Sequence, residues 1–491
     1  MKKSTNRIYI IGAGFAGASI AAEIRRKGIL GQVVAFLDDD REKIGTRIEN
    51  TPVLGPIDAV IDLLQRTPAD EALIAMPGAT RERLRQIYLV LLRAGFARIR
   101  ILPSVAELVD GEAHLIQTRE IDPEDLLGRN PVQINLRESL AYLRGRRVVI
   151  TGAGGSIGSE LARQLLSGGA ERLYLFDHGE NALYEIEREL RLLQEEGVGE
   201  RATIVPVVGE LQDPDYTRFI LGRLRADVVF HAAAHKHVPM MEANPVEAVK
   251  NNVFGTEHLV RAAREAGVKR FVMISTDKVV EPTSVYGASK RIAEQIVLSH
   301  NDPEHAFMVV RFGNVLGSTG SIIPLFRKQI MRGGPVTLTH PDVTRYFMTI
   351  SEAAALVLQA GGVGRPGELY ILDMGEPVRI RDLAEQMVRF YGFEPDEDIR
   401  IDVVGMRPGE KMHERLFETD ERPEPTEHPR LNRVTNAKQL VADLPALLET
   451  LRPICFFDPD QPDRYRRRRA LRAQLSVHVP SLEAPCDEPE Y

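Results

Sequence analysis

Two segments of the chain repeat one order of features: an apolar, β-rich run, a glycine turn and a helical stretch. The first is IYIIGAGFAG, beginning at Ile8, and the second is VVITGAGGSIG, beginning at Val148. Each is followed by another apolar run that leads into an acid, Asp38 in VVAFLDDD and Asp177 in RLYLFD. Strands that alternate with helices in this way predict parallel βαβ units. The expected fold class is therefore α/β, with two Rossmann-type, doubly wound parallel-sheet domains in series.

The expected domain boundaries follow from where this alternation runs and where it stops. With 491 residues the chain exceeds one ordinary domain. We predict an N-terminal Rossmann-like nucleotide-binding domain over 1–120, a connector over 121–146 and a second domain over 147–458. From about Gly317 the alternation loosens into Gly- and Pro-rich pieces, which predicts a small lobe over the carboxyl edge of the second sheet. Residues 459–491 are expected to form a basic stretch and then a disordered tail.

The composition excludes several classes of function. The net charge of −7 gives no electrostatic footprint for nucleic acid, so no such partner is expected. Cys455 and Cys486 show neither metal-ligand spacing nor a disulfide framework, which predicts a reducing, cytoplasmic location. No run reaches the length of a transmembrane helix. Arg464 and the arginines at 466–469 predict either a solvated helix face or a weak attachment to an anionic membrane surface or a partner.

The first glycine turn has the spacing of a dinucleotide site. Gly12, Gly14 and Gly17 form GxGxxG, and Asp38 follows the next predicted strand. No set of reactive side chains follows in this half of the chain. The turn therefore predicts either a second nucleotide site or a Rossmann-shaped domain that binds another ligand or none.

The second glycine turn predicts the main cofactor site. Gly152, Gly155 and Gly158 cradle a pyrophosphate in this interpretation, and Asp177 accepts hydrogen bonds from the adenosine ribose diol. A carboxylate there disfavours a 2′-phosphate, so NAD is the expected cofactor and NADP the alternative. Further cofactor contacts are expected from Ser156, Ile157, Glu210, Leu211, Ala232, Ala233 and Lys290.

The run STDKVVEPTSVYGASK places five reactive side chains close together in the sequence. They are Thr276, Asp277, Lys278, Tyr286 and Lys290. Tyr286 and Lys290 are four residues apart, so they share one helix face, and a nearby ammonium stabilises a tyrosine phenolate. The strand RFVMISTD brings Asp277 and Lys278 to its C-terminal rim, where open α/β sheets bind ligands. The run therefore predicts an enzyme with a hydroxyl base, a carbon-acid base and a leaving-group acid.

The segment HAAAHKH is a candidate metal site, because His231, His235 and His237 are close together in the sequence. It follows a predicted strand, however, and its small residues allow the backbone to approach a cofactor. We therefore expect no metal here, and expect Lys236 and His237 to face a phosphate or a sugar. Asn252, in NNVFGT, is expected either to bond backbone near the active site or simply to pack.

Seven motifs together resemble those of one family: TGAGGSIG, HAAAHKHVP, NNVFGT, STDK with YGASK, RFGNVLGS, TRYFMT and GMRPGEK. The family is that of the UDP-N-acetylglucosamine 4,6-dehydratases, which are extended short-chain dehydrogenases of bacterial polysaccharide biosynthesis. The likeness covers nearly the whole chain, including the N-terminal Rossmann-like domain of the larger members. Those members usually carry membrane helices before that domain and often have methionine where Tyr286 stands. The expectation is a large form without such helices, with retention or inversion at C5 left open.

The resemblance implies a reaction and a role for each reactive side chain. Tyr286, aided by Lys290 and Thr276, would take the proton of the sugar 4-hydroxyl while NAD+ accepts the C4 hydride. Lys278, neutral because it is buried, would remove the C5 proton, and Asp277 would protonate the leaving 6-hydroxyl. The substrate would be UDP-N-acetylglucosamine or a close UDP-sugar, and the enzyme is expected to be a homo-oligomer. The expected substrate contacts are Lys236, His237, Asn252, Asn314, Arg345, Arg407 and Glu410.

Two other functions fit parts of the pattern. A nucleotide-sugar 4-epimerase uses the same Tyr–Lys pair, but it has no need of the acid and base that follow Thr276. A non-catalytic, NAD-binding regulator of glycan assembly is supported only by the extra N-terminal domain. The presence of Asp277 and Lys278 therefore favours dehydration.

Overall fold

A computed structural model describes residues 6–28, 30–96, 98–102, 119–121, 140–199 and 201–482. The chain divides into two compact units, Met1–Ile134 and Asn135–Tyr491, and each unit is described by itself. This division falls within the predicted connector, most of which lies outside the described residues.

The first unit contains the α/β arrangement predicted from its glycine turn. Its described residues form a seven-stranded sheet with the order β3-β4-β2-β1-β5-β6-β7, in which β4 to β6 run parallel. The strands are β1 (Arg7–Ile11), β2 (Gln32–Leu37), β3 (Arg47–Ile48), β4 (Thr51–Gly55), β5 (Glu71–Ile74), β6 (Arg98–Ile101) and β7 (Arg119–Glu120). The helices are α1 (Phe15–Lys27), α2 (Val60–Arg66) and α3 (Arg81–Arg93). The apolar runs of the central strands are buried against α1, as Ile10, Ile20 and Phe36 illustrate.

The second unit is built on a larger, mostly parallel sheet. Its described strands have the order β10-β9-β8-β11-β12-β13-β18-β22-β21, and β22 and β21 are antiparallel. They are β8 (Arg147–Thr151), β9 (Arg172–Asp177), β10 (Thr203–Val208), β11 (Val228–His231), β12 (Arg270–Ile274), β13 (Ala306–Arg311), β18 (Leu369–Leu372), β21 (Arg422–Pro425) and β22 (Leu431–Thr435). The strand order reverses between β8 and β11, and ligands bind at the carboxyl ends of strands at such a reversal.

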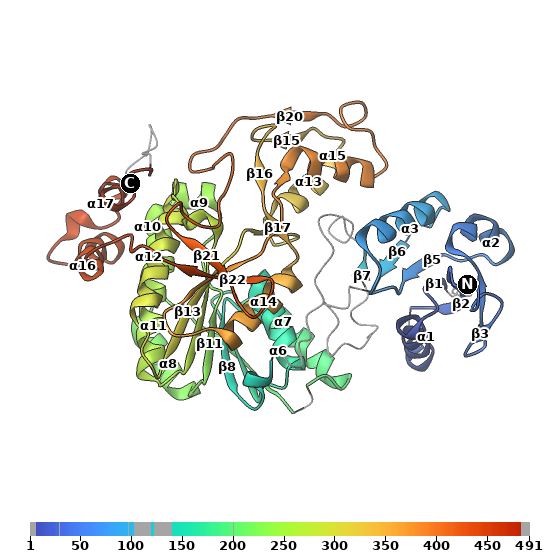
Figure 1. Ribbon diagram of the computed structural model, residues 1–491, viewed down its shortest axis with the longest axis horizontal. Helices are drawn as coiled ribbons and strands as arrows, with labels where there is room; N and C mark the ends of the chain where they lie inside the picture. Colours follow the sequence, from blue (N-terminus) through green and yellow to red (C-terminus); the bar gives the residue numbers. More distant parts are fainter. Residues whose placement is uncertain are drawn as a thin grey trace. The chain divides into compact units, whose positions relative to one another are not determined.

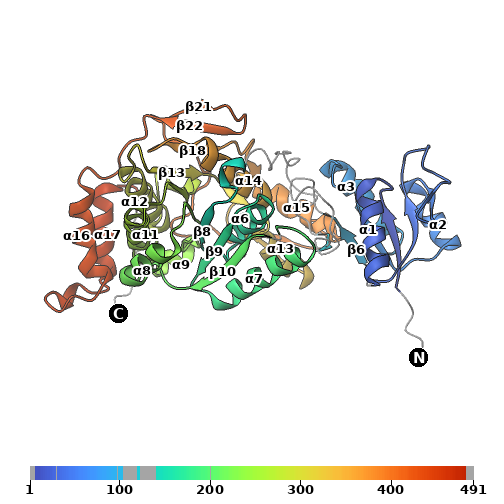
Figure 2. The ribbon, with the colours of Figure 1, turned by 90° about the horizontal axis from the view of Figure 1, so that it is seen from below.

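Helices cover both faces of this sheet, which is why its central strands are apolar on both sides. One face carries α8 (Pro214–Leu224), α11 (Gly255–Glu265) and α12 (Val285–Ser299), and the other carries α6 (Ser156–Ser167) and α14 (Ile350–Val363), as Figures 1 and 2 show. Helix α7 (Glu180–Glu195) follows β9. The fold class predicted for both halves of the chain is therefore confirmed.

A small lobe follows β13, as the Gly- and Pro-rich sequence predicts. It contains α13 (Ile322–Met331), α15 (Ile380–Phe390) and the paired strands β15 (Val336–Leu338) and β20 (Ile401–Val403), at the top of Figure 1. Short pairs tie it to the sheet edge. These are β14 (Asn314–Val315) with β17 (Phe347–Met348), and β16 (Thr344–Arg345) with β19 (Val378–Arg379).

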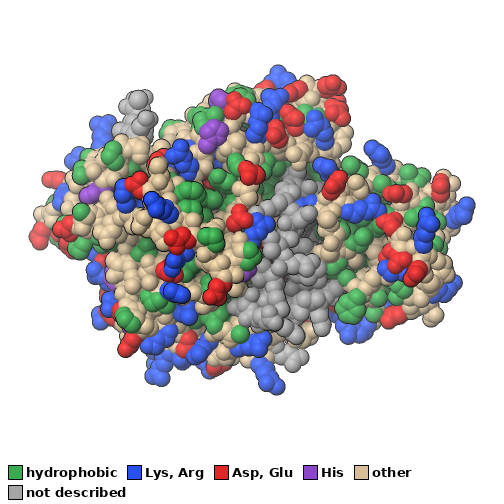
Figure 3. Space-filling view, in the orientation of Figure 1, with side chains coloured by type: hydrophobic (Ala, Val, Ile, Leu, Met, Phe, Trp, Pro, Cys, Tyr) green, Lys and Arg blue, Asp and Glu red, His purple; other side chains and the backbone are tan. Residues whose placement is uncertain are grey.

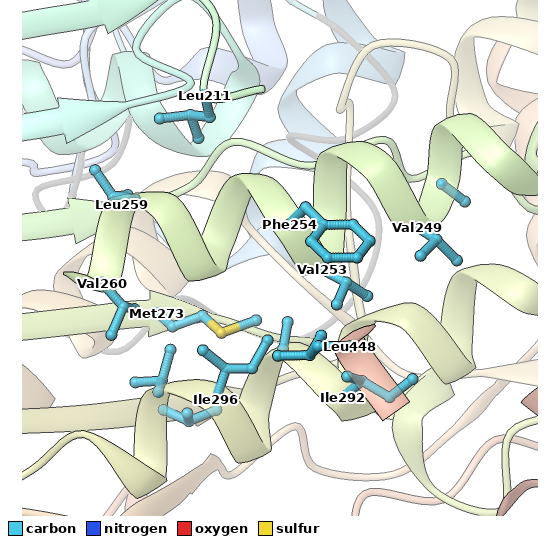
Figure 4. Close-up of a cluster of buried hydrophobic side chains, with 14 of the residues drawn as sticks. Leu211, Val249, Val253, Phe254, Leu259, Val260, Met273, Ile292, Ile296 and Leu448 are labelled. Atoms are coloured by element: carbon cyan, nitrogen blue, oxygen red, sulfur yellow. The ribbon is translucent and has the colours of Figure 1, made fainter. Parts of the chain in front are cut away.

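The C-terminal part of the second unit contains two helices, one within the predicted second domain and one that begins in the predicted basic stretch. Helix α16 (Leu444–Cys455) and helix α17 (Arg468–His478) pack on α10 (Pro245–Val249) and its neighbours, as Figures 1 and 2 show. Figure 4 shows Leu448 of α16 among side chains of α11 and α12 and of the turn before α11. The apolar spacing of Leu471 and Leu475 outweighs the basic composition of the segment, because both leucines are fully buried. The last predicted tail residues, 483–491, lie outside the described part.

Several arginines of this segment are engaged by the protein itself. Arg466 pairs with Glu247 at 2.8 Å, and Arg472, only 3 % exposed, pairs with Glu242 at 2.9 Å. Arg464 donates to the carbonyl oxygen of Thr450 at 3.0 Å. These contacts hold the helix to its own unit, whereas Arg467 and Arg469 are exposed. The attachment to a membrane surface or a partner stays a prediction.

The surface of the described residues carries both signs of charge. Figure 3 shows Lys and Arg side chains intermixed with Asp and Glu side chains over the face in view. None of the described helices is both long enough and apolar enough to cross a bilayer.

Candidate active site

The glycine turn after β8 has the close packing that a dinucleotide cradle requires. Gly152 has a φ of +68°, and a Cβ there would lie 2.7 Å from the backbone nitrogen of Ala233. A Cβ on Gly158 would lie 2.0 Å from the carbonyl oxygen of Gly152. Gly155 caps α6 without a side-chain hydrogen bond, so the first N–H groups of this helix remain available to a phosphate. These residues fit a pyrophosphate, and Ala232 and Ala233 border the same turn as predicted.

Asp177 ends β9 and holds the glycine turn in place. Its Oδ2 accepts from the backbone N–H of Gly154 at 2.9 Å, and its Oδ1 accepts from that of Gly179 at 2.8 Å. Each carboxylate oxygen keeps a second lone pair, so the side chain can still accept the hydroxyls of a ribose. Asp177 fits its predicted role at this site.

The other predicted cofactor contacts lie around this edge and are partly engaged by the protein itself. Ser156 Oγ accepts from the backbone N–H of Thr319 at 3.2 Å, which ties the turn to the loop after β14. The carbonyl oxygen of Leu211 bonds Nδ1 of His258 at 3.0 Å. Ile157 lies in the first turn of α6, and Glu210 follows β10. The cofactor roles of these residues stay predictions.

Asp277 and Lys278 form an ion pair shortly after β12, in which Asp277 is fully buried and the side chain of Lys278 is 20% exposed. Thr276 Oγ1 and Lys278 Nζ both donate to Oδ1 of Asp277, each at 2.9 Å. Lys278 Nζ also donates to Oδ1 of Asn314 at 3.1 Å. The carboxyl group of Asp277 is fully buried, and its Oδ2 has no hydrogen-bond partner among the described residues. An acid poised to meet a ligand has this arrangement.

The charge of Lys278 corrects one prediction. Burial by itself lowers the pKa of Lys278, but the charges of Asp277 and Glu414, together with Tyr286, outweigh burial and raise that pKa above its ordinary value. Lys278 is therefore an ammonium in the ligand-free protein. The expectation that burial alone keeps it neutral is wrong, because it left out the carboxylates that lie beside it.

Helix α12 brings Tyr286 to this pair through a glycine. A Cβ on Gly287 would lie 2.3 Å from the carbonyl oxygen of Lys278, so only glycine permits this approach. Burial raises the pKa of Tyr286, while the charge of Lys278 and a hydrogen bond with Thr276 oppose that rise. The ammonium that favours the phenolate is thus that of Lys278.

Lys290 lies one turn further along α12 and has a different contact. Its Nζ donates to the carbonyl oxygen of Ile274 at 2.7 Å. Burial lowers the pKa of Lys290 to about 8. The helix face shared by Tyr286 and Lys290 is as predicted, but Lys290 is not among the groups that lower the pKa of Tyr286.

The first histidine of the histidine-rich segment, His231, has a structural role. His231 is buried and bonds Thr151 Oγ1 at 2.7 Å and Thr256 Oγ1 at 2.9 Å. Burial lowers its pKa to about 3, so it is neutral. Lys236 and His237 are exposed at the rim and available to a ligand.

Asn252 supports the loop and does not bind substrate. Its side-chain amide donates to the carbonyl oxygen of His235 at 3.0 Å and to Ser289 Oγ at 3.1 Å, and it accepts from the backbone N–H of His235 at 2.9 Å. The amide of Asn251 uses its remaining acceptor site at 3.1 Å. No donor or acceptor is left for a ligand, so of the two alternatives for Asn252 the backbone bond is confirmed and its predicted substrate contact is wrong.

The remaining predicted substrate residues come from the small lobe and its connections. Arg345 donates to the carbonyl oxygens of Thr344 and Met412 at 2.7 and 3.2 Å, and Arg407 is exposed. Glu410 has a buried Oε2 without a hydrogen-bond partner among the described residues. The turn that carries Arg407 and Glu410 packs on the start of α12, where a Cβ on Gly409 would lie 2.8 Å from that of Ser284.

Two sets of buried charges were missed from the sequence. Glu414 acts on Lys278 and Tyr286 through its negative charge. Glu414 stands four residues after Glu410 in the same segment, and this spacing is the one feature of the sequence that could have indicated it.

The second set is a network behind α12. Arg311 Nε and Nη2 donate to the two oxygens of Glu294, each at 2.8 Å, and Nη1 donates to Glu421 at 2.7 Å. Arg291 joins the same two acids at 3.0 and 3.3 Å, and Ser275 donates to Glu294 at 2.7 Å. This network, hereafter the buried charge network, joins α12 to Ser275, just before the Asp277–Lys278 pair, and to the segment after the small lobe.

The first unit contains a second turn of the same construction. Gly12 has a φ of +105°, and a Cβ on Gly17 would lie 2.0 Å from the carbonyl oxygen of Gly12. Asp38 accepts from the backbone N–H of Ala13 at 2.7 Å, as Asp177 does in the second unit, but it also pairs with Lys43 at 3.3 Å. Gly14 caps α1. The geometry fits a nucleotide, and its ligand stays a prediction.

Comparison with known protein families gives a match to most of the second unit. The model of a family described as polysaccharide biosynthesis protein matches residues 148–436, which is more than half of the chain. The chain belongs to the polysaccharide biosynthesis protein family. A model described as CoA-binding domain matches residues 1–103, within the first unit.

Three similar proteins align with different fractions of this chain. The capsular polysaccharide biosynthesis protein CapD of Staphylococcus aureus is 42% identical over 424 residues, which are 86% of this chain and 69% of that protein. A UDP-N-acetylglucosamine 4,6-dehydratase (inverting) of Campylobacter jejuni is 29% identical over 283 residues, 56% of this chain and 79% of that protein. A UDP-glucose 4-epimerase of Rickettsia canadensis is 37% identical over 199 residues, 40% of this chain and 57% of that protein.

Proposed function

We propose that the second unit is an NAD-dependent nucleotide-sugar 4,6-dehydratase. It converts UDP-N-acetylglucosamine, or a close UDP-sugar, to the 4-keto-6-deoxy sugar nucleotide for surface polysaccharide. The observation that carries this proposal is the ion pair of the buried Asp277 with Lys278, beside the buried Tyr286 at the carboxyl edge of the sheet. A dehydratase relative among the similar proteins supports it.

The residues proposed to bind the cofactor lie at the carboxyl ends of β8 and β9. Gly152, Gly155 and Gly158 would hold the pyrophosphate, and Asp177 the adenosine ribose. When bound, NAD supplies reversible hydride acceptance, so that the hydride taken from C4 of the sugar returns at C6 with no net consumption. Lys236 and His237, on the exposed rim, and Arg407 would meet the substrate diphosphate and sugar.

Tyr286 acts on the 4-hydroxyl. Oxidation at C4 requires that this hydroxyl lose its proton, and the phenolate of Tyr286 accepts it. The ammonium of Lys278 and the hydroxyl of Thr276 favour that phenolate. Lys290, fixed on the carbonyl oxygen of Ile274, would hold the cofactor side of the site.

The Asp277–Lys278 pair supplies both protonation states that loss of water needs. One proton moves from Lys278 Nζ to Asp277 along the hydrogen bond of 2.9 Å. This transfer leaves a neutral amine, which removes the C5 proton acidified by the 4-ketone, and a neutral carboxylic acid, which protonates the leaving 6-hydroxyl. The C5–H bond and the C6–O bond break, a C5–C6 double bond forms and water departs. Lys278 then holds a proton, which it would return to C5 when the hydride returns to C6, and Asp277 is again a carboxylate.

The second candidate is a nucleotide-sugar 4-epimerase, which an epimerase among the relatives favours. Epimerisation at C4 needs the Tyr286 base and the cofactor, but it breaks no bond at C5 or C6. It therefore gives no function to the unpartnered, buried oxygen of Asp277 or to its pairing with Lys278.

One experiment separates the two reactions. The purified chain is incubated with UDP-N-acetylglucosamine and NAD in deuterated water, and the products are followed by NMR. Dehydration gives a 4-keto-6-deoxy sugar with solvent deuterium at C5. A C4 epimer without deuterium at C5 would replace the dehydratase proposal with the epimerase, and the absence of any product would refute both for this substrate.

A further inference from the structure

A cavity lies at the amino edge of the larger sheet, away from the residues described above. It has a volume of about 600 Å³ and is formed by the starts of β8 and β9, the residue before β11 and the end of α8. Asp177 ends β9 and Asp277 follows β12, so the proposed cofactor and substrate sites lie at the opposite, carboxyl edge. A cavity of this volume is in the range that holds small molecules.

The lining of this cavity, hereafter the arginine cavity, has an excess of positive charge. It contains five arginines and two acids, although the whole chain has a net charge of −7. Arg147 pairs with Asp227 at 3.5 Å, and Arg172 pairs with Glu171 at 3.6 Å. The other lining arginines are exposed and make no ion pair among the described residues: Arg146, Arg223 and Arg225.

The end of α8 accounts for only part of this excess. The last carbonyl groups of a helix carry about half a negative charge, which cations near the helix end offset. Arg223 lies in the last turn of α8 and Arg225 is its C-cap residue, so two positive charges stand against that half charge. Arg146 precedes β8 and belongs to no helix. The remaining positive charge is therefore available to an anion.

A buried tyrosine lines the same cavity and has an unused hydroxyl. Tyr174 of β9 is 5% exposed, and its ring belongs to the apolar cluster that includes Leu221 and Leu224 of α8. The hydroxyl makes no hydrogen bond with any described residue. A tyrosine that is buried to this extent usually has a partner for its hydroxyl, and a ligand in the cavity would supply one.

We infer that the arginine cavity binds a small anion with two or more phosphate groups, either free or as part of a nucleotide. Guanidinium groups donate paired hydrogen bonds that match the oxygens of a phosphate. The three arginines without an ion pair, Arg146, Arg223 and Arg225, offset most of the charge of a diphosphate, and Tyr174 adds a donor from the buried side. This site is separate from the proposed catalytic residues, so the inference does not rest on the proposed function.

Calorimetry of the NAD-saturated chain with inorganic pyrophosphate tests the inference. Arg223→Gln and Arg225→Gln are each expected to weaken binding by about 10- to 100-fold, because each removes hydrogen bonds to a charged group. Tyr174→Phe keeps the ring and should weaken it by about 3- to 10-fold. Arg218→Gln is the matched control, because Arg218 is an exposed arginine of the same helix that pairs with Glu265 at 2.6 Å outside the cavity. It should bind pyrophosphate as wild type does.

Sites elsewhere in the chain contribute equally to all four variants, so the heat that Arg223→Gln removes comes from the arginine cavity. Orthophosphate should bind at least about tenfold more weakly than pyrophosphate, because it makes fewer charged hydrogen bonds. Guanosine diphosphate that binds more tightly than pyrophosphate would assign the cavity to nucleotides, and equal or weaker binding would assign it to the free anion.

Three results would overturn the inference. They are the absence of pyrophosphate binding at about 1 mM, equal binding by wild type and both arginine variants, and an equal loss in Arg218→Gln. The last result would show that the net charge of the surface, and not the cavity, attracts the anion. Circular dichroism of each variant checks its folding, and the two arginines are exposed, so their replacement leaves the apolar core intact.

Discussion

Replacing Arg311 by methionine tests whether the buried charge network stabilises the second unit. Arg311 is fully buried and makes three charged hydrogen bonds, two to Glu294 and one to Glu421. Methionine fills much of the volume but leaves both acids with Arg291 as their remaining arginine. Removing one member of a buried charge pair costs about 3–5 kcal/mol. That is a large part of the ~5–15 kcal/mol by which a domain is stable.

The cost should depend on pH in a defined direction. Burial already raises the pKa of Glu294 to about 7, although the charge of Arg291 opposes it. Without Arg311 this pKa rises further, so the folded variant binds a proton that the unfolded chain releases. Stability of the variant then falls more than that of wild type as pH rises through about 7. The difference between the two proteins should be larger at pH 8 than at pH 6.

Urea unfolding followed by circular dichroism measures the free energy of unfolding of the second unit. Arg163→Met is the matched control, because Arg163 also makes three charged hydrogen bonds, two to Glu189 and one to Glu160. Its side chain is 28% exposed and that of Glu189 is 41% exposed, so its loss should cost about 1 kcal/mol or less. The reasoning would be refuted if the two variants lost equal free energies of unfolding, or if the loss in Arg311→Met did not change with pH. Burial would then not determine how much this network stabilises the unit.

Three further predictions concern catalysis and the cofactor. Lys278→Met should lower formation of the 4-keto-6-deoxy product by about 10²- to 10⁴-fold while NAD still binds in calorimetry, and wild-type turnover would remove the proposed C5 base. Asp177→Asn should weaken the preference for NAD over NADP, because a carboxylate repels the 2′-phosphate; competition binding that already favours NADP in wild type would contradict this. NAD should bind less tightly above about pH 8, where Lys290 loses its proton, and affinity that stays constant well above that pH would be evidence against its cofactor role.

The parts that follow from sequence are those that depend on local periodicity. Apolar runs, glycine turns and terminal acids recur at fixed spacing, so both sheets and the edge that carries Asp177, Asp277 and Tyr286 could be predicted. Gly287 shows why the catalytic run is so short: its missing side chain lets α12 reach the backbone of Lys278.

The parts that did not follow depend on contacts between distant segments. Glu414 and Glu421 come from beyond the small lobe, and no spacing relates them to Lys278 or Arg311. The raised pKa of Lys278 depends on Asp277 and Glu414, so it could not be derived from burial alone. A helix face was among the alternatives for the C-terminal arginines, but its packing was missed, although Leu471 and Leu475 already had the spacing of a buried helix face.

The packing of α17 has a consequence for how the enzyme is made. Arg472 of this helix binds Glu242, and Glu242 accepts the backbone N–H of Val285 at the start of α12. Synthesis proceeds from the N-terminus, so α12 and its tyrosine leave the ribosome long before the helix that holds their start. Until then, the apolar side chains around Phe254 that α16 covers in Figure 4 face water or a chaperone. A nascent or prematurely stopped chain therefore carries all the residues proposed to act in catalysis, yet lacks the contact of α17 that holds the start of the helix with Tyr286.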